Sequence, residues 1–227
     1  MDKINQVSSG KKWMIVIALG SIWGLSEAGM GMALRGACAR MMTGSIMTGV
    51  AVFFMAASYS SSRRMISLLA ILGIAAGFKL LDAFLLGLPV LHGAIGNPIF
   101  AFYTEIFAFI LVWTILDSKL REKKHGRAMA GGLSALVAVN LFPLVKFATG
   151  VPACVVPGTS YPLALYYSPI AIALSAIACP AGMAAGEQLL SIFSNSPQKS
   201  LIPRLAPVVL RLTPALAIIA VVLLRIV

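Results

Sequence analysis

The chain has 227 residues, of which 59% are hydrophobic and only 11% are charged, and its mean hydropathy is +0.95. A soluble domain carries about a quarter charged residues, so this composition excludes an ordinary soluble fold. The net charge of +11 would favour nucleic-acid binding in a soluble protein. Here the basic residues gather in short segments between apolar runs, which indicates membrane orientation and no nucleic-acid partner.

Apolar runs long enough to cross a bilayer as helices recur from residue 13 to the C-terminus. The sequence shows no alternating β-barrel pattern, so it predicts an all-α, polytopic bundle that forms a single integral membrane domain over 1–227. The predicted spans are 12–34, 41–60, 65–87, 98–117, 128–148, 161–186 and 205–226. Arg211 and the prolines at 207 and 214 interrupt the last segment, so the bundle has six spans, or seven if that segment crosses.

Lysine and arginine bias predicts the orientation of these spans. With the N-terminus inside, the cytoplasmic flanks hold Lys3, Lys11, Lys12, Arg63, Arg64, Lys119, Arg121, Lys123, Lys124, Arg127, Lys199 and Arg204. The outer flanks hold only Arg35, Arg40 and, if the last segment spans, Arg225. The sequence therefore predicts a cytoplasmic N-terminus. Two apolar loops rich in Gly and Pro, 86–98 and 149–162, then lie outside and are expected to form a lid.

Ionisable residues within the predicted spans cost about 2.5–3.5 kcal/mol each at a helix centre, and they indicate function by default. Such residues, with polar neighbours at the same depth, come from several segments of the outer half: Glu27, Lys79, Asp82, His92, Asn97, Glu105, Asn140 and Lys146. This pattern favours one polar cavity that opens outward and binds a small molecule. The alternative is internal pairing that only holds helices together, Lys79 with Asp82 and Lys146 or Arg35 with Glu27 or Glu105.

Small residues form stripes where helix backbones can approach closely. The first span carries Gly20, Gly24, Ala28 and Gly31, and the third carries Gly73 and Gly77. In the third span this glycine face points away from the face with Lys79 and Asp82. We expect the glycines to pack on a neighbouring or partner helix.

Motifs for catalysis are missing from the sequence. It has no GxxxxGK[ST] phosphate-binding loop and no HExxH zinc motif. Of its two histidines, His125 lies in a charged loop, so no bis-histidine haem site is expected in the membrane. The stretch "GLSEA" at 24–28 lacks the last glycine of the GxSxG hydrolase motif, and Cys38, Cys154 and Cys179 show no CxxC spacing. We expect no enzyme activity, cofactor or metal site.

The stretches "GSIWGLSEAGMGMAL", "GSIMTGVAVFFM", "GFKLLDAFL" and "GNPIFAFYTE", with the predicted topology and capped pocket, resemble the substrate-binding S components of energy-coupling factor (ECF) transporters. They are also similar to bacterial membrane proteins of this size. The resemblance covers the first four spans. It implies a subunit of the bacterial inner membrane, in contact with lipid, that captures a small molecule and works with a coupling membrane subunit and two ATPases. It also implies that Gly20, Gly24 and Ala28 contact the coupling subunit.

Several embedded charges exceed what a neutral vitamin needs and suit a charged or zwitterionic ligand. Two other functions remain open at this point. One is a non-catalytic membrane scaffold that assembles a larger complex through its glycine faces. The other is a small ion-coupled carrier or channel that uses Glu27, Asp82 and Glu105.

Overall fold

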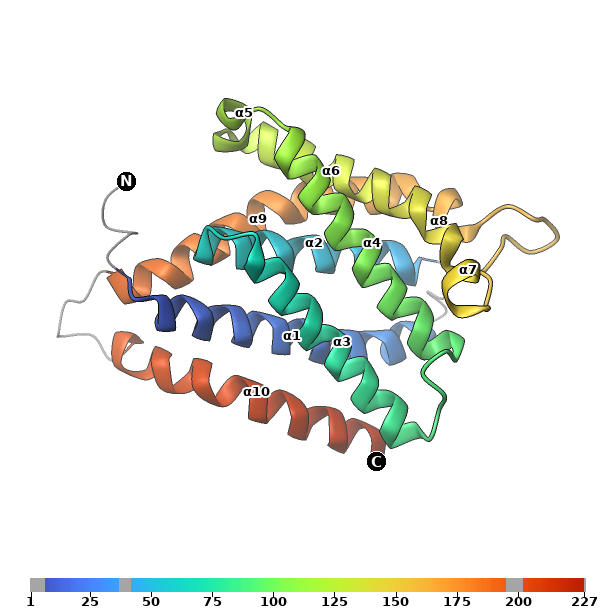
Figure 1. Cartoon of the computed structure of the whole chain (residues 1–227), viewed down its shortest axis with the longest axis horizontal. Helices are drawn as coiled ribbons and strands as arrows, with labels where there is room; N and C mark the ends of the chain where they lie inside the picture. The colour runs from blue at the N-terminus through green and yellow to red at the C-terminus, as the bar shows by residue number, and fades with distance from the viewer. Residues whose placement is uncertain (1–6, 37–41, 195–201, 227) are drawn as a thin grey trace.

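The protein is an all-α bundle whose computed structural model describes residues 7–36, 42–194 and 202–226, with backbone alone at 30–36, 194 and 202–204. The long helices are α1 (Ser9–Gly36), α2 (Thr43–Ser62), α3 (Ile66–Leu86), α4 (Gly93–Ile115), α6 (Lys124–Leu141), α9 (Ser168–Ser194) and α10 (Ile202–Ile226). Shorter elements are α5 (Ser118–Glu122), the 3-10 helix η2 (Phe142–Leu144), α7 (Val145–Thr149) and α8 (Leu163–Tyr166). Figure 1 shows the long helices packed side by side, with α7 and α8 together at one end.

Six segments of the described chain are long and apolar enough to cross a membrane. They are α2, α3, α4, the stretch Lys124–Thr149 that joins α6 to α7, most of α9, and Leu205–Ile226 in α10. Large apolar side chains face outward from them, including Phe84 at 82% exposure and Phe107 at 56%. Such surfaces suit lipid better than water. The chain is a multi-pass, α-helical membrane protein, as the sequence predicts.

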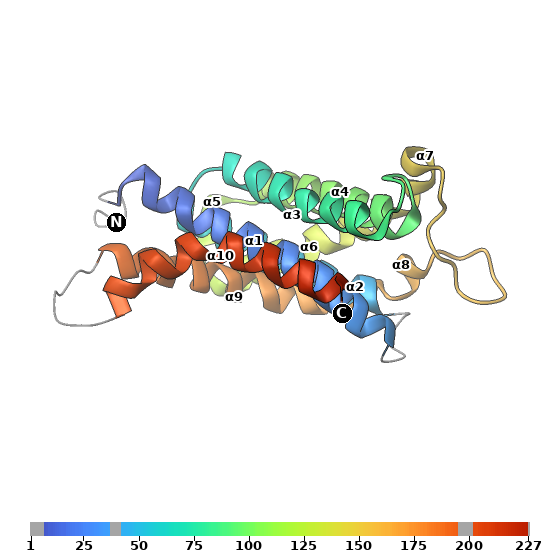
Figure 2. The same ribbon diagram turned by 90° about the horizontal axis from the view of Figure 1, so that it is seen from below.

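The 28-residue helix α1 lies inside this arrangement, against α2, α3 and α10. Figure 2 shows α10 running beside α1 on one side of the bundle. The last segment, which the sequence left open, is a continuous helix despite Pro207 and Pro214. Its position along α1 makes α10 a seventh long helix of the described bundle.

Local sequence explains where the helices end. Gly87 and Gly150 adopt left-handed backbone angles, with φ of 62° and 76°, and close α3 and α7. Residues with a side chain rarely adopt these angles, which favour glycine. Pro143 stands at the join of α6 with η2, where it removes a backbone donor and ends the regular helix. The predicted span 128–148 is therefore α6 followed by two short turns.

The two ends of the bundle differ in charge. At the end where α1 begins, the described chain gathers Lys11, Lys12, Arg63, Arg64, Lys119, Arg121, Lys123, Lys124 and Arg127. We call this the basic end, and the end with α7 and α8 the outer end. Two of these arginines share Glu187, since Arg63 and Arg127 lie 3.2 and 3.1 Å from its Oε1. The basic residues assigned to the cytoplasmic flanks thus share one end, except those outside the described side chains.

Helices α2, α6 and α9 make the closest backbone contacts. A Cβ at Gly186 would meet the Ala57 carbonyl oxygen, and a Cβ at Gly182 would meet that of Phe53. Nearer the start of α9, a Cβ at Gly131 of α6 would meet the Ser175 carbonyl oxygen. These contacts are possible only because the three residues lack side chains.

Candidate functional site

A cavity of about 560 Å³ lies toward the outer end of the bundle. Its walls come from α1, α2, α3, α4 and α6, with η2, α8 and the loop before α8 completing it. The volume falls in the range of small-molecule sites, which is about 300–1,000 Å³. The apolar part of the lining includes Met47, Phe102, Val139, Phe142 and Leu163.

Three charged side chains from three helices line this cavity. Glu27 of α1 and Lys79 of α3 are each 7% exposed, and Glu105 of α4 is 5% exposed. Glu27 lies within electrostatic reach of Lys79, and Glu105 lies within reach of Glu27 and beside Thr48. Among the described residues, neither glutamate has a basic group within ion-pairing distance. Two buried acids thus face the same space without a direct counter-charge.

Asp82 lies next to the cavity rather than on its lining, at the centre of a buried ion cluster. Its carboxylate accepts two bonds from Arg225 of α10, from Nε to Oδ1 and from Nη2 to Oδ2, both 2.9 Å. Lys79 Nζ lies 3.5 Å from Asp82 Oδ2. Arg225 Nη2 also donates to the Ala28 carbonyl oxygen at 3.4 Å. The cluster joins α3 and α10 and reaches α1 through its backbone.

Arg225 is the residue that sequence reasoning missed, because it had been assigned to an outer flank. A fork-shaped guanidinium bound to both carboxylate oxygens is the strongest geometry for such a pair. The available signal was depth: Arg225 lies in the last turn of α10, and Asp82 lies in the last two turns of α3. The expected pairing of Lys79 with Asp82 is present.

The two apolar loops contact each other above the cavity. Asn97, in the second turn of α4, lines the cavity. Its side-chain oxygen accepts a hydrogen bond from Thr149 Oγ1 of α7 at 3.2 Å. Thr149 also receives the Val151 backbone N–H at 3.1 Å. Cys154, in the loop that follows, lines the cavity and is exposed. These residues form the cover that the sequence led us to expect, although Asn97 is on a helix and not in the loop.

Three predicted site residues lie away from the cavity. His92 is exposed and caps α4, its Nδ1 accepting the Ala94 N–H at 3.2 Å. Asn140 is exposed and donates to the Leu136 carbonyl oxygen of its own helix at 2.8 Å. Lys146 is exposed, 5.4 Å from the ring centroid of Phe147. The prediction that these residues join the others was wrong, because depth in the membrane does not fix which way a helix face points.

The glycine stripe of α1 packs inside the chain. A Cβ at Gly20 would stand 3.0 Å from Ile74 of α3, and one at Gly24 would stand 2.5 Å from Phe78. Ala28 is buried against Phe78 and two residues of α10, Ala217 and Val221. The expected close packing is present, but the contact is with α3 and α10, so these residues are not open to a partner subunit.

The third-span glycines behave differently. Gly73 and Gly77 are exposed, and a Cβ at either position would have no neighbouring atom within 4 Å. Lys79 and Asp82 are buried on the opposite side of α3, as the spacing predicts. The surroundings of Gly31 and Arg35, and Arg40 altogether, lie outside the described residues.

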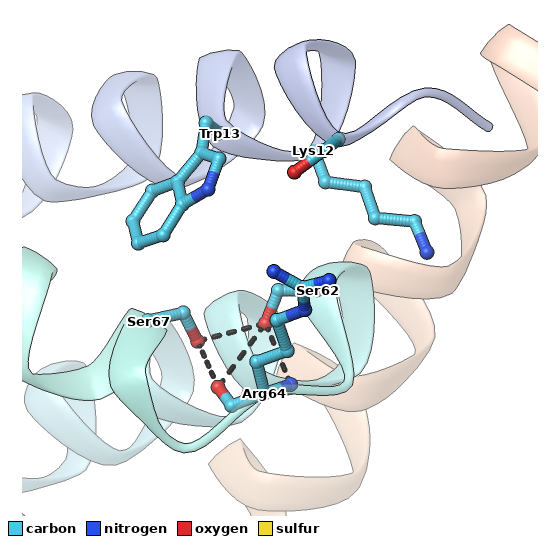
Figure 3. A pocket seen from close by; sticks show the side chains of 6 residues that line it. Lys12, Trp13, Ser62, Arg64 and Ser67 are labelled. Atoms are coloured by element: carbon cyan, nitrogen blue, oxygen red, sulfur yellow. Dashed lines mark hydrogen bonds between the residues drawn. The ribbon is translucent and has the colours of Figure 1, made fainter.

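A second, much smaller cavity of about 10 Å³ lies at the basic end between α1 and the turn from α2 to α3 (Figure 3). Ser62 donates to Ser67 at 2.8 Å, and Ser67 donates to the Arg64 carbonyl oxygen at 2.7 Å. Figure 3 shows these bonds facing Lys12 and Trp13 of α1. The space is about that of one water molecule, so this is a closed structural turn and not a ligand site.

Fold and site together define the class: a polytopic α-helical membrane protein with a covered cavity lined by charged side chains at its outer end. No protein-family model, curated protein or solved structure matches the chain.

Proposed function

We propose that the protein captures a small molecule in the outer cavity, as a substrate-binding membrane subunit of a transporter. The observation that supports this is the cavity of about 560 Å³ in which Glu27, Lys79 and Glu105 meet from three helices. Buried ionisable groups are costly in a membrane protein. If these three side chains only stabilised the helix bundle, they would not need to line an open cavity.

The resemblance to S components of ECF transporters motivates the rest of the proposal. A coupling membrane subunit and ATPases would then drive release on the cytoplasmic side, and the protein would lie in a bacterial inner membrane. One family feature does not carry over, since Gly20 and Gly24 are covered by α3. The partner contact would need another surface.

The test is native mass spectrometry of the protein in lipid nanodiscs, looking for a co-purifying small molecule and for partner chains. Ala101 lines the cavity, and Ala101→Phe would fill part of it. The matched control is Ala215→Phe, at an exposed position of α10. We expect the first variant to lose the small molecule and the second to keep it.

Equal retention by both variants, or no bound molecule in the wild type, would contradict capture in this cavity. Reconstitution in liposomes separates capture from an ion-coupled carrier. The isolated chain should bind solute without moving it, whereas a carrier moves solute down an ion gradient on its own.

A further inference from the structure

Charge balance among the described residues around the cavity leaves one acid over. Two acids and two bases near the cavity balance each other. Asp82 forms ion pairs with Lys79 and Arg225, and Glu27 interacts electrostatically with Lys79. Glu105 is a fifth charged residue, 5% exposed, and it lines the cavity. Glu27, an acid of the same sign, lies within electrostatic reach of it. In the described part of the chain, no base lies within ion-pairing distance of Glu105.

Among the described residues, the same balance leaves no base over. Lys79 already faces two acids, at 3.5 Å from Asp82 and within electrostatic reach of Glu27. Arg225 is engaged with both oxygens of Asp82. An anionic group entering the cavity would therefore find no uncommitted base among the described lining residues, and it would lie beside two acidic side chains. A cation would instead pair with Glu105.

The remaining lining indicates an organic cation rather than a metal ion. Among the described residues, no group of three or more His, Cys, Asp or Glu side chains could hold a metal. The cavity is far larger than an ion, and Phe102 and Phe142 line it. Aromatic faces attract ammonium groups as well as apolar surface.

We propose that the ligand is a small organic molecule with one positive charge, an amine or quaternary ammonium group on an apolar body, and that Glu105 is its counter-charge. This rests on the proposed function, that the cavity holds a ligand at all. A zwitterion is disfavoured because, in the part of the chain that the structure describes, no base on the lining is left for its carboxylate.

Cys154 allows the sign of the cavity to be measured without knowing the ligand. It is exposed and lines the cavity, whereas Cys179 is buried; Cys38→Ala removes the remaining thiol. The Cys38→Ala protein in nanodiscs is treated at pH 8 with 2-(trimethylammonium)ethyl methanethiosulfonate or with the anionic 2-sulfonatoethyl reagent. Each rate is divided by that of a small free thiol. We expect the cationic reagent to react at least about fourfold faster, which is the ratio that one unit charge produces across about 10 Å of water.

Controls assign the effect to Glu105. Glu105→Gln should bring the two normalised rates to within about twofold of each other. Glu122→Gln makes the same charge change on exposed α5 at the basic end and should leave the preference intact.

Because the net charge of the chain is +11, the protein as a whole favours the anionic reagent, so a preference for the cationic reagent must come from groups near Cys154. Equal rates in the parent protein, or a faster anionic reagent, overturn the proposal. If Glu105→Gln does not fold, Glu105→Leu removes the same charge and provides the comparison.

The mass-spectrometry experiment separates the two proposals. A co-purifying molecule that is a cation and slows Cys154 labelling supports both. A neutral or anionic molecule that protects Cys154 supports capture and overturns the cation assignment. A cation preference at Cys154 with no bound molecule in any preparation overturns capture, and the cation as its ligand, while the preference of the cavity for positive charge stands.

Discussion

The region where α2, α6 and α9 meet and the region where α1, α3 and α4 meet use opposite means of bringing helices together. In the first, Gly131, Gly182 and Gly186 let backbones touch, and almost no space remains. In the second, buried charges on three helices surround a cavity of about 560 Å³. Lipid is as apolar as the helix surfaces, so association depends on close packing and polar contacts. The first region uses packing, and the second uses charge and keeps its space.

The comparison predicts that the outer end depends most on one carboxylate. Asp82→Asn removes the negative charge between Lys79 and Arg225. Breaking a buried ion pair by removing one partner costs about 3–5 kcal/mol. We expect a loss of this size in the free energy of unfolding, measured by reversible unfolding in mixed micelles, with α10 detached at its C-terminal end.

Replacement of both sides of the pair is the control for Asp82. The double variant Asp82→Leu, Arg225→Met removes acid and base together and should be closer to the wild type than Asp82→Asn. A single variant as stable as the wild type would mean that the cluster does not hold α10.

For the close-packed region, we predict that one methyl group is enough to separate helices. Gly186→Ala places a Cβ against the Ala57 carbonyl oxygen of α2. Overpacking of this kind costs about 1–3 kcal/mol. The matched control is Gly73→Ala on α3, where nothing lies within 4 Å. The same unfolding experiment should show a loss for Gly186→Ala and almost none for Gly73→Ala; similar losses would remove the distinction between the two faces.

Hydropathy and charge were sufficient to predict the helical class, the gathering of basic residues at one end and the depth of Glu27, Lys79 and Glu105. These properties depend on distance along a helix, which the sequence displays directly. The rotation of each helix about its axis depends on neighbours far away in the chain. For that reason Asn140 was placed in the cavity when it faces outward. The spacing likewise left open whether Gly20 packs on a neighbouring or a partner helix, and the neighbour is Ile74 of α3.

Arg225 illustrates the same difficulty for ion pairs. Lys79 and Asp82 are three residues apart on one helix, so their pairing follows from helix geometry. Arg225 reaches Asp82 across 143 residues, and only the packing of α10 against α1 and α3 brings them together. A local pattern cannot supply that contact.

The cover over the cavity is expected to depend on Thr149. Thr149→Val keeps the shape but removes the hydroxyl that donates to Asn97 and accepts from the Val151 backbone. Loss of these bonds costs about 1 kcal/mol. The opening of the cover can be observed separately, because Cys154 lies in the adjoining loop: we expect faster labelling by a bulky maleimide. Thr159→Val, in the same loop and away from Asn97, is the control; equal labelling of both variants would argue against a cover held at Thr149.

The smallest expected change has the opposite sign and links stability to the cavity. Glu105 is buried without a base at ion-pairing distance among the described residues, so it destabilises the empty protein. Glu105→Gln keeps the shape and removes the charge, and it should raise the free energy of unfolding of the ligand-free protein by at least about 0.5 kcal/mol. The control Glu187→Gln changes an acid that pairs with two arginines, and it should give no such gain.

Binding sites commonly retain groups that lower the stability of the empty protein, because the ligand supplies the missing interaction. A more stable Glu105→Gln protein that no longer holds its small molecule is the result expected of a binding residue, whereas a purely structural Glu105 would lose stability on the same change.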